Sequence, residues 1–265
     1  LKGPNFNGNQ YVRQAFESGA SFCVCDEITG YSNDDIIVVD NCLECLQQLA
    51  KYHRMQFKIP FIAITGSNGK TTTKELITEV LSSTYRTYST IGNLNNHIGV
   101  PLTLLKIKKD AEIAVVEMGA NHQKEIESYC AYTLPTHGMI TNCGKAHLEG
   151  FGGEEGVKKG KGELFDFLRA HRGIAFINND YDYLEEMSLG IASIISYGEK
   201  EADITGESIT DENYLEVKIT KGALLPSIKT QLVGDYNLPN ILAAVCVGKT
   251  FNVCDEKIKV ALENY

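Results

Sequence analysis

The chain has 265 residues, of which 43% are hydrophobic and 22% are charged, as is usual for a globular protein. Its formal net charge of −9 argues against a nucleic-acid or anionic-membrane surface, because such surfaces need clustered Lys and Arg. No apolar run approaches the roughly 20 residues that a helix needs to span a bilayer, so no membrane insertion is expected. The sequence starts at Leu1 without a charged and then apolar leader, and we interpret it as part of a longer cytoplasmic chain.

Eight cysteines raise the possibility of disulfides or of a zinc site. Cys23 and Cys25 alternate with apolar residues, and a buried strand is expected there. Cys42 and Cys45 have CxxC spacing but lie within a helical pattern, and no second pair or nearby histidine pair completes a zinc site. Buried, reduced thiols are therefore expected.

Residues 1 to 57 form a first block that reads as half of a small α/β domain. The pattern predicts a helix at about 9–18, strands at 21–25 and 36–39, and a helix at about 42–57. Two strands make too small a sheet to stand alone, so further strands are expected to precede this block.

From Pro60 onward strands and helices alternate. Residues 61–65 are a continuous apolar run, as in a strand buried on both faces, and a helix follows from Lys70. Further strands are predicted at 113–117, 137–141, 173–178 and 191–197, two or three antiparallel strands within about 202–233, and a helix from near Pro239. The expected fold is α/β: residues 58–265 form a mainly parallel, doubly wound P-loop sheet with a small antiparallel subsection.

The strongest local signal is the stretch Thr65-Gly66-Ser67-Asn68-Gly69-Lys70-Thr71-Thr72, where a buried strand breaks at glycines and passes into a helix. Glycines let backbone N–H groups face a phosphate, and a helix N-terminus adds partial positive charge. Lys70 can neutralise terminal phosphates, and the hydroxyl of Thr71 can hold Mg²⁺. The general motif has another glycine where Ile64 stands, so the loop is shorter than in most P-loop proteins. The alternative is a glycine-rich turn without a ligand.

Two side chains follow the carboxyl ends of predicted strands, on the side of the sheet where the phosphate loop lies. Glu117 ends the strand 113–117, and His147 comes after the strand 137–141. A carboxylate and an imidazole there could coordinate a metal bound to a nucleotide. Alternatively, Glu117 is simply solvated and His147 is a hydrogen-bonded core residue.

Lys161 falls within the apolar stripe of a helix predicted at about 155–170, with Gly160 and Gly162 beside it. Glycines cost a helix about 1 kcal/mol each relative to alanine, but they let another segment or a ligand come close. Burial, together with the nearby Lys158 and Lys159, should lower the pKa of Lys161 and leave an amine able to react covalently. The alternative is a packed stem whose ammonium reaches solvent.

The segment 234–240 precedes an alanine-rich helix and contains two asparagines. Asn237 suits a helix cap. Asn240 lies inside the first turn, where capping does not explain it, and its amide could read the edge of an adenine.

These segments together resemble the Mur ligase family, and the resemblance covers the whole chain. The loop from Thr65 to Thr72 is similar to the family's short ATP loop. The stretches GNLNNHIGVP from Gly92, EMGANH from Glu117 and AHLEGFG from Ala146 resemble those of the branch that adds D-alanyl-D-alanine.

The resemblance implies roles for the residues singled out above. Residues 66–72 would bind ATP, with two Mg²⁺ sites formed by Thr71, Glu117, His147 and a carbamate that CO₂ forms on Lys161. Lys70, Lys161 and His147 would be catalytic, and Asn240 would contact adenine. Asn95 and Asn96 would meet the muramoyl substrate, although a turn that asparagine favours explains them equally well. The family usually has His where this chain has Tyr236, and the role of that position stays open.

The resemblance further implies a bacterial cytoplasmic enzyme of peptidoglycan synthesis that joins D-Ala-D-Ala to UDP-MurNAc-tripeptide through an acyl phosphate. Residues 1–57 would end the UDP-substrate-binding domain, and a dipeptide-binding domain would follow Tyr265. A monomer is expected, while the third residue of the peptide stays open. The alternatives are another Mur ligase, a folylpolyglutamate synthetase-like ligase, and, for this chain by itself, a nucleotide-binding module without catalysis.

Overall fold

The computed structural model describes residues 1–27, 30–31, 33–144, 148–209 and 214–265. Its largest feature is a nine-stranded sheet in the order β13-β12-β11-β10-β9-β8-β5-β7-β6. The seven strands β5 to β11 are mutually parallel. Strands β12 and β13 extend the sheet beyond β11 in antiparallel pairing. Their bounds are Phe61–Thr65 (β5), Thr87–Ser89 (β6), Ile113–Glu117 (β7), His137–Ile140 (β8), Ile174–Asn178 (β9), Ser193–Gly198 (β10), Ile204–Ser208 (β11), Glu216–Lys221 (β12) and Ile228–Lys229 (β13).

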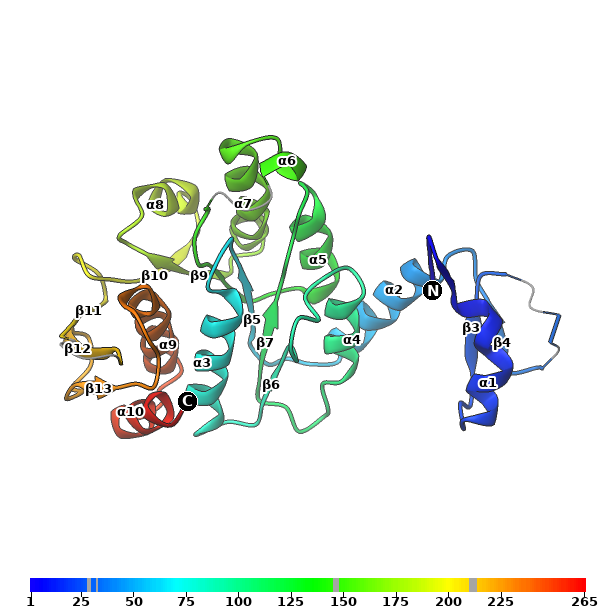
Figure 1. Ribbon diagram of the computed structural model, residues 1–265, viewed down its shortest axis with the longest axis horizontal. Coiled ribbons are helices and arrows are strands. Elements are labelled where there is room, and N and C mark those ends of the chain that lie inside the picture. Colours follow the sequence, from blue (N-terminus) through cyan, green and yellow to red (C-terminus); the bar gives the residue numbers. More distant parts are fainter. Residues whose placement is uncertain (28–29, 32, 145–147, 210–213) are drawn as a thin grey trace.

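Helices cover both faces of this sheet (Figure 1). One apolar core joins the sheet to α3 (Lys70–Ser82), α9 (Leu238–Thr250) and α10 (Asp255–Asn264). The other core lies beneath α2 (Cys42–Arg54), α4 (Gly99–Leu105), α5 (Glu125–Thr133), α6 (Leu148–Phe151), α7 (Glu154–Ala170) and α8 (Asp182–Ser188). In β5 and β7 every residue is buried, because alternate side chains enter opposite cores. The doubly wound α/β fold predicted from the sequence is confirmed.

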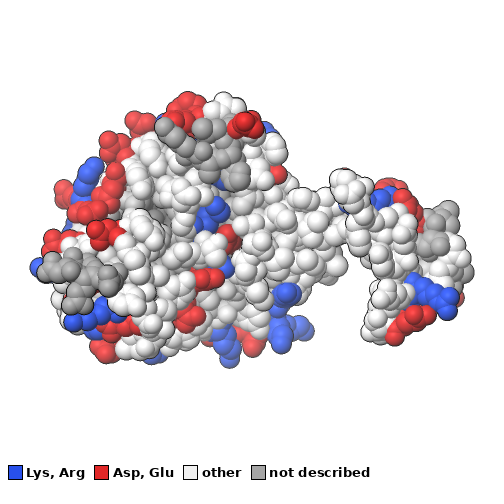
Figure 2. All heavy atoms as spheres, viewed as in Figure 1, with Lys and Arg blue, Asp and Glu red and all other residues white. Residues whose placement is uncertain are grey.

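The first 40 residues form a small separate block, which a narrow neck joins to the large body (Figures 1 and 2). The block contains the hairpin β1 (Lys2–Gly3) and β2 (Phe6–Asn7), the 3-10 turn η1 (Gly8–Tyr11) and helix α1 (Val12–Glu17). A parallel pair, β3 (Cys23–Cys25) and β4 (Ile36–Val38), completes it. Helix α2 leads from the block into the large body, and its Ala50 is part of the second core.

Two sequence-based predictions need correction. The expected buried strand at 21–25 is mostly exposed: Phe22 is 63% exposed and Val24 40% exposed, and of these residues Cys25 alone is buried. The expected helix at 9–18 starts as a 3-10 turn. The antiparallel strands predicted within about 202–233 are confirmed as β11, β12 and β13, and β11 also continues the parallel sheet beside β10.

All eight cysteines are free thiols, as expected, but Cys254 is exposed and three others are only half-buried. In the described part of the chain, no helix is long and apolar enough to cross a membrane.

Candidate functional site

The loop between β5 and α3 lies at the carboxyl edge of the parallel strands. Gly66 has φ +145°, and a Cβ there would meet the Thr141 hydroxyl oxygen at 2.0 Å, so a side chain cannot be accommodated. Gly69 has φ +79° and immediately precedes α3. The two glycines therefore allow the sharp turn that directs the N-terminus of α3 toward this edge, where its first N–H groups have no partners within the helix.

Residues after β8 hold the same loop in place. Thr141 donates its hydroxyl hydrogen to the carbonyl of Asn68 (2.6 Å), and Asn142 accepts the backbone N–H of Asn68 on its side-chain oxygen (3.1 Å). The backbone N–H of Ser67 donates to the carbonyl of Asn142 (2.9 Å). Because the N–H groups of Ser67 and Asn68 are already bonded to β8's end, the N–H groups of the first turn of α3 remain for a phosphate.

Lys70 folds back over the loop. Its ammonium donates to the carbonyl oxygens of Gly66 (2.7 Å) and Ser67 (3.0 Å). Burial lowers the pKa of Lys70, and the nearby Glu117 opposes this effect. The Lys70 ammonium thus lies beside the phosphate loop, where it could contact a terminal phosphate.

Glu117 is wholly buried at the end of β7, which rules out a solvated carboxylate. Its Oε1 accepts hydrogen bonds from the Thr71 hydroxyl (3.1 Å) and from the Asn95 amide (2.8 Å). Its Oε2 has no hydrogen-bond partner among the described residues. A carboxylate beside a hydroxyl fits Mg²⁺, which takes oxygen ligands, keeps several waters and completes its shell with phosphates.

Lys161 lies within the apolar face of α7 and is only 2% exposed. Its pKa falls to about 8, first because of burial and next because of Lys70, whereas the expected Lys158 and Lys159 are not among the causes. The ammonium donates to the carbonyl of Ala120 (3.1 Å) and lies 5.1 Å from the ring centre of Phe151. The alternative interpretation of Lys161, an ammonium that reaches solvent, is therefore excluded.

The close approach expected at the glycines of α7 is found at Gly160. A Cβ there would meet a ring carbon of Phe151 at 2.4 Å, so the approaching group is a segment of the chain itself. Phe151 belongs to α6 and covers Lys161 from that side. His147 lies outside the described residues. Within the described ranges, no cluster of three or more His, Cys, Asp or Glu could hold a metal.

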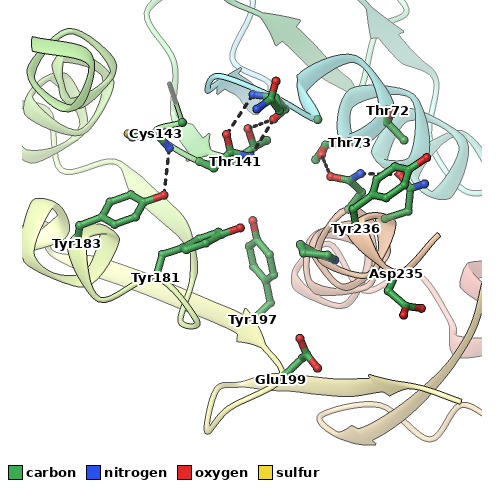
Figure 3. A pocket seen from close by; sticks show the side chains of 17 residues that line it. Thr72, Thr73, Thr141, Cys143, Tyr181, Tyr183, Tyr197, Glu199, Asp235 and Tyr236 are labelled. Carbon is green, nitrogen blue, oxygen red and sulfur yellow. Dashed lines mark hydrogen bonds between the residues drawn. The ribbon is translucent and has the colours of Figure 1, made fainter. Parts of the chain in front are cut away.

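A cavity of about 700 Å³ opens between the loop and the first turn of α9. Figure 3 shows three tyrosines, Tyr181, Tyr183 and Tyr197, along one side of it and Tyr236 on the other. Tyr181 and Tyr183 are stacked, with ring centres 5.4 Å apart, and the Tyr183 hydroxyl accepts the N–H of Cys143 (3.0 Å). An aromatic wall beside a phosphate loop suits a planar base.

Asn240 lines this cavity, but its amide is already bonded on both sides. Its oxygen accepts from the Thr73 hydroxyl (2.9 Å), and its nitrogen donates to the side chain of Asn237 (2.9 Å). Asn237 does not cap α9 through its side chain, contrary to expectation, because its side-chain oxygen accepts from Asn240, while its nitrogen donates to the carbonyl of Val233 (3.0 Å). The hydrogen bond between Asn237 and Asn240 thus stabilises the start of α9.

A second cavity of about 420 Å³ adjoins Lys70 on the other side of the loop, and Asn95 and Asn96 line it. The amide of Asn95 is committed to Glu117, and Asn96 accepts the N–H groups of Ile98 (3.1 Å) and Gly99 (2.8 Å) at the start of α4. The turn interpretation therefore accounts for the Asn96 side-chain oxygen, and the residue as a whole lines a polar cavity.

Sequence reasoning missed the tyrosines of the larger cavity and the buried Lys74. Tyr181 and Tyr183 follow the end of β9, so the strand-end rule that selected Glu117 could have found them. Lys74 falls one and two turns before Ile77 and Leu81 on the apolar stripe of α3, the pattern that singled out Lys161.

Comparison with known proteins identifies the family of this chain. The family model described as "Mur ligase middle domain" matches residues 64–248, which include the loop, Glu117, Lys161 and Asn240. The chain belongs to the Mur ligase family. Sequence relatives named UDP-N-acetylmuramoyl-tripeptide–D-alanyl-D-alanine ligase include those of Bacillus subtilis, 33% identical over 97% of this chain, and Escherichia coli, 35% identical over 100% of it.

A solved structure of MurF ligase from Thermotoga maritima in complex with ADP superposes with a TM-score of 0.89 at 27% identity and covers 100% of this chain. The chain spans 56% of the Bacillus relative, 59% of the Escherichia relative and 62% of the Thermotoga chain. The family and the fold are thus established for this chain, which corresponds to about three fifths of each relative.

Proposed function

We propose that this chain is the nucleotide-binding part of an ATP-dependent ligase that joins D-Ala-D-Ala to UDP-MurNAc-tripeptide in the bacterial cytoplasm. One observation carries the proposal: the phosphate loop separates two cavities. Asn68, Gly69 and Thr72 line the larger, aromatic cavity, whereas Lys70 lines the smaller, polar one. A nucleotide in the first and a carboxylate substrate in the second would meet at Lys70. The names of the Bacillus and Escherichia relatives supply the substrate pair.

The chemistry requires positioning and charge neutralisation more than reactive groups. The terminal carboxylate of the tripeptide attacks the γ-phosphorus of ATP, so that an acyl phosphate forms and ADP leaves. The dipeptide amine then attacks the acyl carbon, loses a proton and expels phosphate to leave the amide. Lys70 holds the transferring phosphoryl group, and Mg²⁺, held by Thr71 and Glu117, would supply further positive charge there.

The second metal site of the proposal uses Lys161. Its lowered pKa of about 8 makes a neutral amine available to add CO₂, which yields a carbamate and releases a proton. The carbamate would replace a buried cation by a carboxylate that a second Mg²⁺ can bind together with His147. The hydrogen bond from Lys161 to Ala120, which lines the polar cavity, supports this location.

At the nucleotide base, we propose that Asn240 contacts adenine through the second hydrogen of its amide nitrogen, beside the bond to Asn237, and that Tyr236 packs next to it. Tyr236 is 77% exposed and lines the larger cavity, so its ring is free to move onto a base. At the other end, Asn96 would bind the UDP-linked substrate through its amide nitrogen. Asn95 would support that cavity through Glu117, to which its amide nitrogen donates.

We propose a domain boundary at the neck. The sequence predicts residues 58–265 as the ATP-binding domain and residues 1–57 as the end of a UDP-substrate-binding domain, so that the two boundaries differ by helix α2. Helix α2 is shared between them: it packs into the core of the large body, while the N–H of Cys42 at its start donates to Asp26 (3.3 Å). On packing alone, the boundary falls before Cys42.

The test is an assay on a full-length protein that contains this chain. Phosphate release is measured with ATP, D-Ala-D-Ala and each candidate UDP-MurNAc-tripeptide in turn, with lysine or diaminopimelate as the third residue. We expect dipeptide-dependent release with one of them and an amide product of the matching mass. Release that depends instead on a folate and glutamate would replace the proposal with a folylpolyglutamate synthetase-like activity.

A further inference from the structure

Lys74 is a buried lysine that the proposed reaction does not use. It lies on α3 one turn after Lys70, and its side chain is 2% exposed. Placing a lysine there is costly, because an ammonium loses its hydration on burial unless a charge or hydrogen bonds compensate it. Its neighbours therefore indicate what it does.

Two carboxylates lie within reach of the Lys74 ammonium. Glu117 Oε2 is 3.8 Å away in the buried interior, and Glu75 Oε1 is 3.5 Å away on a side chain that is 43% exposed. Glu75 is also held from its other side, because the Tyr265 hydroxyl donates to its Oε2 (2.6 Å). Lys74 thus lies between a surface carboxylate and the carboxylate of the candidate magnesium site.

The other contacts of Glu117 hold its backbone and its Oε1 but not its Oε2. Its backbone N–H donates to the Thr90 hydroxyl (3.0 Å), and its Oε1 accepts from Thr71 and Asn95. Among the described residues, Oε2 has no hydrogen bond, and Lys74 is the cation paired with it. Without Lys74, the carboxylate plane would be defined by Oε1 alone.

We propose that Lys74 is a positioning residue for the magnesium site: it draws Glu117 Oε2 toward α3, so that the carboxylate presents Oε1 beside the Thr71 hydroxyl to the cation. The inference rests on the proposed function, because it takes Glu117 as a ligand of nucleotide-bound Mg²⁺. It assigns Lys74 no contact with the phosphates, which Lys70 and the first turn of α3 receive.

Positioning of Glu117 and simple repulsion between Lys74 and the metal ion predict opposite effects. If Lys74 only adds positive charge near the cation, its removal strengthens metal binding, because one repulsive interaction disappears. If Lys74 orients Glu117, its removal weakens metal binding, because the carboxylate loses its fixed direction.

The experiment measures binding of a non-hydrolysable ATP analogue to the 265-residue chain, with and without Mn²⁺, by calorimetry. The Mn²⁺ signal in electron paramagnetic resonance is recorded in parallel. For Lys74→Met, which keeps an unbranched apolar stem, we expect the metal-dependent gain in affinity to fall about tenfold. Metal-free affinity should stay within about threefold, and the Mn²⁺ spectrum should change. Lys74→Arg should retain most of the gain, because it keeps the cation.

Glu75→Gln is the matched control, since it neutralises the other carboxylate near Lys74 outside the site, and its gain should stay within about twofold of wild type. An unchanged or larger gain in Lys74→Met would overturn the inference. If Lys74→Met does not fold, Lys74→Gln is measured under the same criterion. A wild-type chain without any metal-dependent gain would overturn the proposed magnesium site itself, and the inference with it.

Discussion

At the scale of single residues, the two buried lysines show what a sequence pattern can and cannot reveal. Lys161 could be predicted, because a lysine on an apolar helical face between glycines is conspicuous, and its burial and lowered pKa are found. The influence of Lys70 on the pKa of Lys161 could not be predicted, because Lys70 is distant in the sequence and the sheet brings the two residues close. The bond between Asn95 and Glu117 was likewise unpredictable, because it joins a loop to a strand end.

The proposed carbamate leads to a prediction for Lys161. Replacing Lys161 by Ala in the full-length enzyme should lower the rate about 100-fold, because a metal ligand is lost. Acetate should restore part of the rate by occupying the same position. Lys158→Ala is the control, since Lys158 lies on the same helix with its side chain 35% exposed, and it should keep nearly full activity. A Lys161→Ala rate that no small carboxylate improves would favour a structural lysine.

Asn96 permits a separation of structural and binding roles. Asn96→Asp keeps the oxygen that accepts the N–H groups of Ile98 and Gly99, but it removes the amide nitrogen. We expect both Asn96→Asp and Asn96→Ala to raise the KM for the UDP-linked substrate several-fold in the full-length enzyme, with the KM for ATP nearly unchanged. An Asn96→Asp enzyme with wild-type kinetics would leave Asn96 as a turn residue only.

At the scale of secondary structure, buried parallel strands were the most predictable elements. The apolar runs at 61–65 and 113–117 match β5 and β7, since a strand buried on both faces must be apolar throughout. Strand direction was less accessible: alternation marks β11 and β12 as strands but does not distinguish parallel from antiparallel pairing. The 3-10 turn before α1 was missed because its local pattern resembles the first turn of an α-helix.

Arg54, which the sequence pattern did not single out, is one of the side chains that attach helix α2 to the large body. The guanidinium of Arg54 donates to the carbonyl oxygens of Phe57 (2.9 Å), Thr133 (2.8 Å) and Leu134 (2.8 Å), and lies 3.6 Å from the ring centre of Phe61. Burial lowers the pKa of Arg54 to about 10, so it stays charged at neutral pH and its charge suits the C-terminal carbonyls of α5.

Arg54→Met should therefore destabilise the protein by about 2–4 kcal/mol, because three carbonyl oxygens lose their donor in a partly buried setting. Urea denaturation followed by circular dichroism measures the change. Gln48→Ala, at an exposed position on the same helix, should change stability by no more than about 0.5 kcal/mol. Equal effects of the two substitutions would mean that Arg54 does not fasten α2.

At the scale of the whole molecule, a small block and a large body meet at a neck, and the proposed site lies entirely within the large body. The sequence predicts two units and assigns α2 to the first of them, because α2 follows that block in the chain. Packing assigns it differently, since Ala50 is completely buried in the core of the large body. Which unit a connecting helix joins depends on tertiary contacts, which a local pattern does not contain.

Truncation tests this division. A chain that starts at residue 41 should keep nucleotide affinity and nearly the full melting temperature of the large body. A chain that starts at residue 58 lacks α2 and exposes core, so its melting temperature should fall by at least about 5 °C. If the shorter chain melts at the same temperature, α2 belongs with the small block after all.

The most direct test of the central claim is calorimetric titration of this chain with a non-hydrolysable ATP analogue in the presence of Mg²⁺. The loop, α3 and the aromatic cavity lie within the chain, so we predict Mg²⁺-dependent binding near one nucleotide per chain, without turnover of ATP. Lys70→Ala should weaken that binding by at least about tenfold, or 1.4 kcal/mol, because the cation at the mouth of the loop is lost. Binding that is absent, or that Lys70→Ala leaves unchanged, would contradict the assignment of the nucleotide site.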